Sequence, residues 1–193
     1  MSSTSDSGLK RVFASALTLF GRHGFQRTSM ANIAREAGIA RATLYLRFPD
    51  KRALFNALAS SLVDEALVRA EAAWLPDASL SENIAATLLA KDLGFFHILN
   101  STPHGAELLE LDAELTAPHV ARLDAGFAAL LTERGREAAQ EGADLTAFDG
   151  VDGFAAFLAT AGSSLKHETR TEEAFRSIVD RLARVSARAA GQT

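Results

Sequence analysis

The chain has 193 residues, of which 48% are hydrophobic and 23% charged, so it can bury the core of one or two globular domains. It contains no cysteine, which excludes disulfides, thiol catalysis and cysteine-ligated metal sites. No apolar run reaches the roughly 18 residues of a membrane span, and no secretory signal is visible at the start. We therefore expect a cytoplasmic protein with no membrane partner.

The formal net charge of −4 hides an uneven distribution. Residues 1–58 contain nine Lys or Arg and three Asp or Glu, a balance of +6, whereas the other 135 residues carry −10. A basic segment on an acidic body indicates a polyanionic partner for that segment. A solvated charged face is the alternative that charge alone leaves open.

Apolar residues recur at helical spacing along most of the chain, which predicts an all-α fold of about nine helices without strands. The predicted helices span residues 9–23, 30–37, 41–48, 50–75, 79–99, 106–115, 116–141, 146–167 and a last segment from 169. Small polar residues and glycines at their ends supply caps and stops. The residues expected in these roles are Gly24, Thr28, Ser29, Gly38, Asp50, Ser79 with Glu82, Thr146 with Asp149, and Thr169 with Glu172.

The two short helices around Gly38 form a predicted helix-turn-helix unit. Gly38 accepts a positive φ in the turn, while the small Ala34 lets the helices pack closely and Ile39 fills the core between them. On the second of these helices, Leu44 and Phe48 lie four residues apart and face inward. The remaining side chains of that helix then point outward, where they can read base edges in the major groove of DNA.

A wider stretch, Val12–Leu58, resembles the TetR family of bacterial transcriptional regulators. The family pattern reads roughly T-x-x-x-I-A-x-x-A-G-V-S-x-G-T-L-Y-x-x-F-x-x-K-x-x-L, and the chain has T-S-M-A-N-I-A-R-E-A-G-I-A-R-A-T-L-Y-L-R-F-P-D-K-R-A-L from Thr28 to Leu54. The resemblance implies a homodimeric, ligand-responsive regulator, usually a repressor, that binds double-stranded operator DNA. It assigns DNA binding to residues 1–50, and ligand binding and dimerisation to residues 51–193.

The resemblance also carries individual DNA-binding residues onto this chain. Thr28, Tyr45 and Lys51 stand where family members commonly touch phosphates, and Ser29 is placed in the same surface. The positions where bases are read hold Arg41, Ala42, Thr43, Leu46 and Arg47. Two departures affect this set: Ala40 replaces the usual Ser or Thr and removes a helix cap worth about 1 kcal/mol, and Leu46 replaces a frequent His or Tyr.

Aromatic and large aliphatic residues fall on the helices that form the ligand pocket in this family. A lining of this kind recognises apolar area first, so we expect a small apolar effector, aromatic or acyl. Plain core packing is the alternative for each of these residues. The candidate lining is Leu62, Trp74, Leu88, Phe95, Phe96, Leu99, Leu111, Phe127 and Leu130, with Lys91 and Asp92 among the few charges nearby.

The last two predicted helices carry apolar residues on more than one face, which predicts a two-fold dimer interface of four helices. The candidate interface residues are Val151, Phe154, Leu158, Leu165, Phe175, Ile178, Val179, Leu182 and Val185. No Glu-x-x-His, His-x-x-x-His or Gly-rich phosphate motif occurs, so we expect no enzyme, metal or cofactor. Two alternatives stay open: a constitutive DNA-binding dimer without an effector, and a helical-bundle enzyme.

Overall fold

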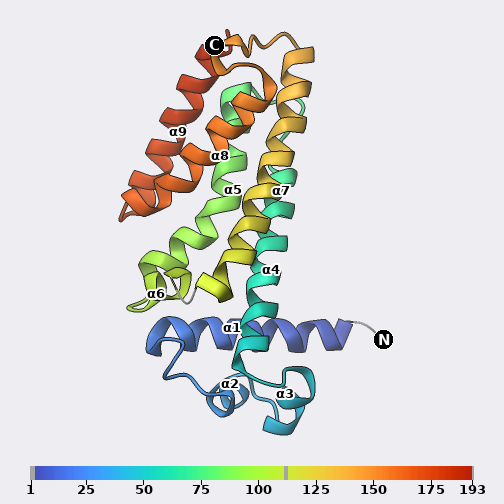
Figure 1. Cartoon of the computed structure of the whole chain (residues 1–193), viewed down its shortest axis with the longest axis vertical. Helices are drawn as coiled ribbons and strands as arrows, with labels where there is room; N and C mark the ends of the chain where they lie inside the picture. The colour runs from blue at the N-terminus through green and yellow to red at the C-terminus, as the bar shows by residue number, and fades with distance from the viewer. Residues whose placement is uncertain (1–2, 111–112, 193) are drawn as a thin grey trace. The chain divides into compact units, whose positions relative to one another are not determined.

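The computed structural model describes residues 3–110 and 113–192, and the regular elements of this part of the chain are all helical (Figure 1). In chain order they are α1 (Ser3–His23), α2 (Met30–Glu36), α3 (Arg41–Arg47), α4 (Lys51–Ala72), α5 (Leu80–Ser101), α6 (Gly105–Glu110), α7 (Ala113–Gln140), the 3₁₀ turn η1 (Thr146–Phe148), α8 (Val151–Glu168) and α9 (Glu172–Ala189). The predicted all-α fold is confirmed. None of the helices within the described ranges is both long and apolar enough to cross a membrane.

Packing divides the chain into two compact units. Unit 1 comprises Met1–Leu62 and Ile98–His119, and unit 2 comprises Val63–His97 and Val120–Thr193. Helices α4, α5 and α7 contribute residues to both units. The functional division at residue 50 stays a prediction, but the packing division differs from it, because later residues complete the core around the helix-turn-helix segment.

The core of unit 1 is built around three aromatic rings. Phe20 and Phe25 have ring centroids 5.2 Å apart, so Phe25 packs back on α1, which ends before the predicted stop at Gly24. Phe55 of α4 joins both rings at 6.0 and 5.5 Å. Leu108 of α6 is buried in the same core, and α6 packs against α1. The sequence pattern did not indicate that α6 belongs to this unit.

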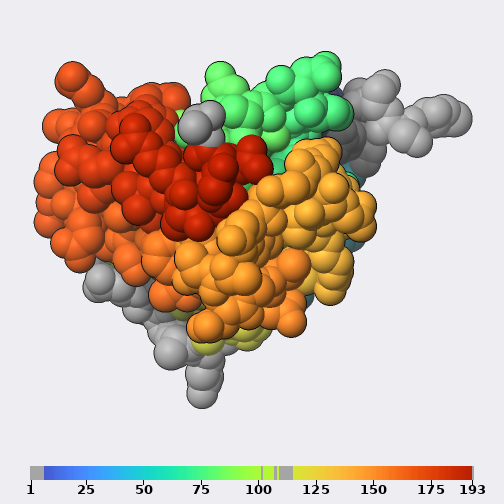
Figure 2. All heavy atoms as spheres, turned by 90° about the horizontal axis from the view of Figure 1, so that it is seen from above, coloured from blue at the N-terminus to red at the C-terminus, as the bar shows by residue number. Residues whose placement is uncertain are grey.

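Unit 2 has a separate core with its own aromatic contacts. Phe96 of α5 stacks on Phe175 of α9, with centroids 5.0 Å apart and planes within 5° of parallel. Phe127 of α7 and Phe154 of α8 are also fully buried. The face drawn in Figure 2 shows α9, in red, beside the orange residues of α8, and the two helices are in contact.

Several predicted helix ends are confirmed by their hydrogen bonds. The Asp50 carboxylate accepts a bond of 2.7 Å from the Ala53 backbone N–H at the start of α4. Ser79 and Glu82 form the predicted capping box: Ser79 Oγ accepts from the Glu82 N–H at 3.2 Å, and the Glu82 carboxylate accepts from the Ser79 N–H at 2.8 Å. These short-range signals fix where α4 and α5 begin.

The predicted caps of the last two helices are wrong. Thr146 begins the short η1 turn instead, and Asp149 has φ 62°, so α8 begins only after Gly150. Thr169 donates its hydroxyl to the Leu165 carbonyl at 3.1 Å and closes α8. The cap of α9 is Thr171, whose Oγ1 accepts from the Ala174 N–H at 3.2 Å.

The predicted start of the seventh helix is also too late. Helix α7 begins at Ala113 rather than Thr116, and Pro118 lies inside it. Pro118 is the sixth residue of α7, beyond the first four N–H groups that have no partner within a helix, so α7 continues through a proline that lacks one backbone donor. The sequence signal therefore identified the first turns of α7 but not its first residue.

Candidate functional site

The helix-turn-helix unit has the geometry that the sequence predicts. Ser29 caps α2 by accepting a hydrogen bond of 3.2 Å from the Asn32 N–H. Gly38 has φ 66°, a left-handed conformation that glycine adopts without strain, and the Ile39 N–H donates to the Ala34 carbonyl at 3.0 Å. The turn between α2 and α3 is thus closed by backbone bonds, and Leu44 of α3 is fully buried beneath it.

The outer face of α3 is a short row of exposed side chains. Leu44 and Phe48 face the core, at 0% and 9% exposure. Leu46 is 87% exposed, which leaves its whole side chain available to a partner. Ala40 provides no side-chain cap at the start of α3, as its sequence predicts. The predicted base-reading residues, all of them exposed, are Arg41, Ala42, Thr43, Leu46 and Arg47.

Arg41 and Tyr45 form a pair on this face. The guanidinium carbon of Arg41 lies 5.3 Å from the centroid of the Tyr45 ring, one helical turn away. The stacking orders a long side chain that otherwise loses considerable rotamer freedom when it binds. A guanidinium held at the first turn of an exposed helix can donate two bonds to a guanine edge.

Thr28 and Lys51 do not present their polar groups as the sequence predicts. Thr28 is only 3% exposed, and its hydroxyl contacts the carbonyls of Gly24 at 2.9 Å and Leu19 at 3.2 Å. The side chain therefore ties the α1–α2 connection to the end of α1. The structure leaves no exposed hydroxyl at Thr28 for a phosphate.

Lys51 is bound to the same connection. Its Nζ donates to the carbonyls of Phe25, Gln26 and Thr28 at 2.6, 3.1 and 2.9 Å. The ammonium also lies 4.4 Å from the centroid of the Phe25 ring. These contacts use all three N–H donors of an ammonium group, and burial lowers the pKa of Lys51. We interpret Lys51 as the residue that holds the connection before α2 in place.

The predicted effector-lining residues do not form one set in the structure. Leu62 and Leu99 belong to unit 1, whereas Leu111 lies outside the described residues. In unit 2, one group is packed in the core at 3% exposure or less, and another is half-buried around it. The buried group is Leu88, Phe96 and Phe127, and the half-buried group is Trp74, Phe95 and Leu130.

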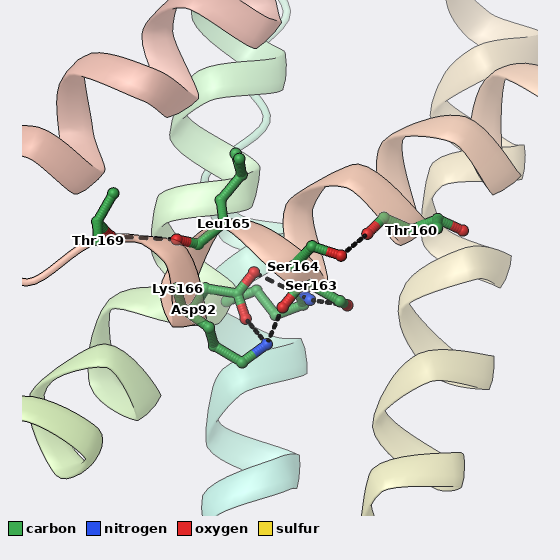
Figure 3. A network of polar contacts seen from close by, with 8 residues as sticks. Asp92, Thr160, Ser163, Ser164, Leu165, Lys166 and Thr169 are labelled. Atoms are coloured by element: carbon green, nitrogen blue, oxygen red, sulfur yellow. Dashed lines mark hydrogen bonds and ion pairs between the residues drawn. The ribbon is translucent and has the colours of Figure 1, made fainter. Parts of the chain in front are cut away.

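A network of buried charges lies among these residues (Figure 3). Lys91 and Asp92 of α5 are each 1% exposed, and Lys91 Nζ is 3.0 Å from Asp92 Oδ2. Lys166 of α8 pairs with the other carboxylate oxygen, Oδ1, at 3.2 Å. Lys91 also donates to Ser163 Oγ at 3.3 Å, and its Nζ lies 4.5 Å from the Phe127 centroid. Burial lowers the pKa of Lys91, and Asp92 opposes that shift.

Part of this network is indicated by the sequence. Two adjacent charges within an otherwise apolar helix, Lys91 and Asp92, marked it on α5. Lys166 and Ser163 were missed because their positions on α8 match an ordinary solvated face. Only packing in unit 2 brings them to α5.

Four of the predicted dimer-interface residues are corrected by the structure. Phe154, Leu158, Phe175 and Val179 are no more than 1% exposed and belong to the core of their own chain. An apolar helical stripe has the same sequence pattern whether it faces its own core or a second copy. Val185 remains available at 58% exposure, and Phe157 of α8 is also exposed, at 43%. The other four, all half-buried, are Val151, Leu165, Ile178 and Leu182.

Comparison with known proteins places the helix-turn-helix segment in a family. Residues 12–58 match the model of the bacterial regulatory proteins of the tetR family. The helix-turn-helix segment is therefore similar to that of the TetR family. The matched segment lies within the first sequence segment of unit 1, which contains α1, α2 and α3, and ends four residues before the end of that segment at Leu62.

Curated relatives match over the same region. The HTH-type transcriptional regulator YhgD of Bacillus subtilis is 28% identical over 81 residues, which cover 42% of each chain. The HTH-type transcriptional repressor ComR of Escherichia coli is 35% identical over 57 residues, or 30% of this chain and 27% of ComR. The chain thus matches less than half of the length of these relatives.

Solved structures extend the similarity of fold to nearly the whole chain. A tetR-family regulatory protein from Rhodococcus RHA1 has a TM-score of 0.65 at 19% identity and covers 96% of this chain and 98% of its own. FadR of Bacillus subtilis, in complex with stearoyl-CoA, gives 0.60 at 17% identity, covering 92% and 96%. The SmeT–triclosan complex gives 0.69 at 15% identity, covering 95% and 91%.

Proposed function

We propose that the protein is a homodimeric transcriptional repressor that binds operator DNA through α3 and is released by a small molecule bound in unit 2. The exposed outer face of α3 carries the proposal. It presents two arginines, a threonine hydroxyl and an exposed leucine from a helix whose inner face is fixed in a core. Such a face offers both hydrogen-bond donors for base edges and apolar contact for thymine methyl groups.

Charge supports DNA as the partner of this segment. The balance of +6 over residues 1–58 opposes the acidic remainder of the chain. Positive charge near α3 lowers the free energy of binding to any DNA by releasing counterions. The side chains on α3 then supply the sequence preference.

The outer face of α9 supports a second copy of the chain as a partner. A shallow groove of about 460 Å³ is lined by Glu172, Glu173, Arg176, Ser177, Asp180 and Arg184. The first turn of α9, with Glu172 and Glu173, makes one end of the groove acidic, and Arg184 makes the other end basic. In an antiparallel two-fold pairing of α9 with its copy, Glu173 of one chain would oppose Arg184 of the other, so the face is complementary to itself.

The effector role of unit 2 is supported by two of the similar structures. FadR of Bacillus subtilis was solved with stearoyl-CoA, which carries a long apolar acyl chain, and SmeT was solved with triclosan. In our proposal the effector and the operator favour different states of the dimer. Their competition is a coupling free energy, which is the same whichever ligand binds first.

A constitutive DNA-binding dimer is the second candidate function. Full burial of Leu88, Phe96 and Phe127 favours it, because these side chains already fill the core of unit 2. The two candidates share their DNA-binding surface and differ only in whether a small molecule weakens binding to the operator.

Selection of bound sequences from a random DNA library tests the proposal. We expect enrichment of a palindromic operator whose half-sites lie about one helical turn, or a multiple of it, apart. Enrichment of no sequence above the starting library would overturn sequence-specific regulation. Addition of candidate apolar ligands to the selected complex separates the two functions, because a constitutive binder keeps its operator with every compound.

A further inference from the structure

The charges buried between α5 and α8 do not balance. Two ammonium groups, from Lys91 and Lys166, converge on the single carboxylate of Asp92 (Figure 3). Asp124 of α7 also attracts Lys91, but it is exposed, so solvent screens its charge. The Lys166 side chain keeps 12% exposure, whereas that of Lys91 has 1%. A surplus of positive charge therefore lies at Lys91, away from water.

A buried charge of this kind is costly unless an anion neutralises it. Asp92 keeps the ammonium of Lys166 at 3.2 Å without Lys91, so Lys91 is not required to neutralise that carboxylate. The retained surplus charge is the feature expected of a site whose second anion is a ligand.

A buried polar atom without a partner marks the same place. Thr87 precedes Lys91 by one turn of α5 and therefore lies on the same side of the helix. Its hydroxyl is fully buried and has no hydrogen-bond partner among the described residues. Asp92 Oδ2, by contrast, is paired with Lys91 Nζ at 3.0 Å. Buried polar atoms without partners are rare, and an absent ligand is one reason for them.

We propose that Lys91, with Thr87 and Lys166, binds the carboxylate of an amphiphilic small molecule inside unit 2. A single surplus positive charge matches a carboxylate better than a phosphate monoester, which carries nearly two negative charges near neutral pH. The side chains around Lys91 determine the chemistry of the ligand beyond its carboxylate. Leu88 and Phe95 lie one turn to either side on α5, and the Phe127 ring lies against the ammonium, so the skeleton behind the carboxylate is aliphatic or aromatic.

The inference rests on the proposed function for the role of unit 2 as the effector region, and it refines the effector from an apolar compound to an apolar acid. The ligand enters by displacing the packed side chains around Lys91, since Leu88 and Phe127 are fully buried. Binding of the carboxylate then competes with Asp92 for the ammonium of Lys91.

Calorimetric titration of the whole protein without DNA tests the inference. The probes are octanoate, dodecanoate and palmitate below their micellar concentrations, each paired with its methyl ester as an uncharged match. We expect at least one acid to bind one site per chain about 10- to 100-fold more tightly than its ester, the range that bonds to a charged group support. Lys91→Met should remove this preference and leave ester binding unchanged.

Lys10→Met is the matched control, because Lys10 is an exposed lysine on α1 of unit 1, and we expect it to keep the preference for the acid. If Lys91→Met fails to fold, Lys166→Met, whose side chain is closer to solvent, should reduce the preference in the same direction. Equal binding of every acid and its ester, or an unchanged preference in the folded variants, would overturn the inference. Tight binding of an acid that leaves the operator complex intact would support the site and contradict effector release instead.

Discussion

Among single residues, Lys51 shows how one position can match a family pattern and still have a structural task. The lysine stands where family resemblance predicts a phosphate contact. In the folded chain its ammonium instead satisfies three carbonyls of the connection before α2. Carbonyl oxygens that lose a charged donor must find water or remain unpaired, which destabilises the fold.

We therefore expect Lys51→Met to act first on stability. Urea denaturation should show a loss of about 1–3 kcal/mol in the free energy of unfolding, from the loss of charge-assisted bonds. The salt dependence of DNA binding should change by less than the one unit per chain that a lost phosphate contact causes. Lys10→Met serves as the exposed control on α1. A variant of unchanged stability whose salt slope falls by a full unit would show that Lys51 contacts phosphate.

At the scale of helices, local signals predicted the starts of α2, α4 and α5 but not those of α7, α8 and α9. Ser79 and Glu82 accept hydrogen bonds from each other's backbone N–H groups within one helical turn, so the sequence pattern alone predicts the start of α5. Thr169 and Thr171 are equally good caps in sequence. The difference arises because Thr169 bonds back to Leu165 and leaves the cap of α9 to Thr171. The local sequence therefore does not determine which of the two threonines caps α9.

Close packing of α8 on α5 gives a prediction for two helix glycines. A Cβ at Gly162 of α8 would lie 2.5 Å from Leu88 Cδ2, in a fully buried part of the core. Gly162→Ala should therefore lower the free energy of unfolding by about 1–3 kcal/mol through overpacking. Gly94→Ala, where the nearest side-chain atom is 3.4 Å away, should raise it by up to about 1 kcal/mol through helix propensity.

Urea denaturation of the two alanine variants measures both effects on the same scale. Each variant replaces a glycine within a helix, so their difference isolates the close approach of α8 to Leu88. Equal stabilisation by both alanines would contradict the packing described for unit 2.

At the scale of the whole molecule, we expect the dimer to depend on the charges of α9. Arg184→Glu should weaken dimerisation about tenfold in sedimentation, because two-fold symmetry places each pair in the interface twice. Adding Glu173→Arg should restore part of the loss, since the pair is re-formed with its charges exchanged. Equal dimerisation constants for the wild type and Arg184→Glu would contradict a dimer built on this face of α9.

The sequence predicted the fold class, the helix-turn-helix turn at Gly38 and the exposed face of α3, because each depends on contacts within one or two helical turns. It could not separate core from interface for Phe154 or Phe175, since both environments require the same apolar stripe. The pairing of Lys91 and Lys166 with Asp92 involves residues up to 75 positions apart, which only the packing of α8 on α5 brings together.

The most direct test of sequence-specific DNA binding through α3 is the ratio of affinities for the selected operator and for random DNA, measured by fluorescence anisotropy in the wild type and in Arg41→Ala. We predict that Arg41→Ala lowers this ratio by about 10- to 100-fold, equivalent to about 1–3 kcal/mol for one guanine contact, while affinity for random DNA changes much less. An equal ratio in the two proteins would contradict the assignment of α3 as the helix that reads the operator.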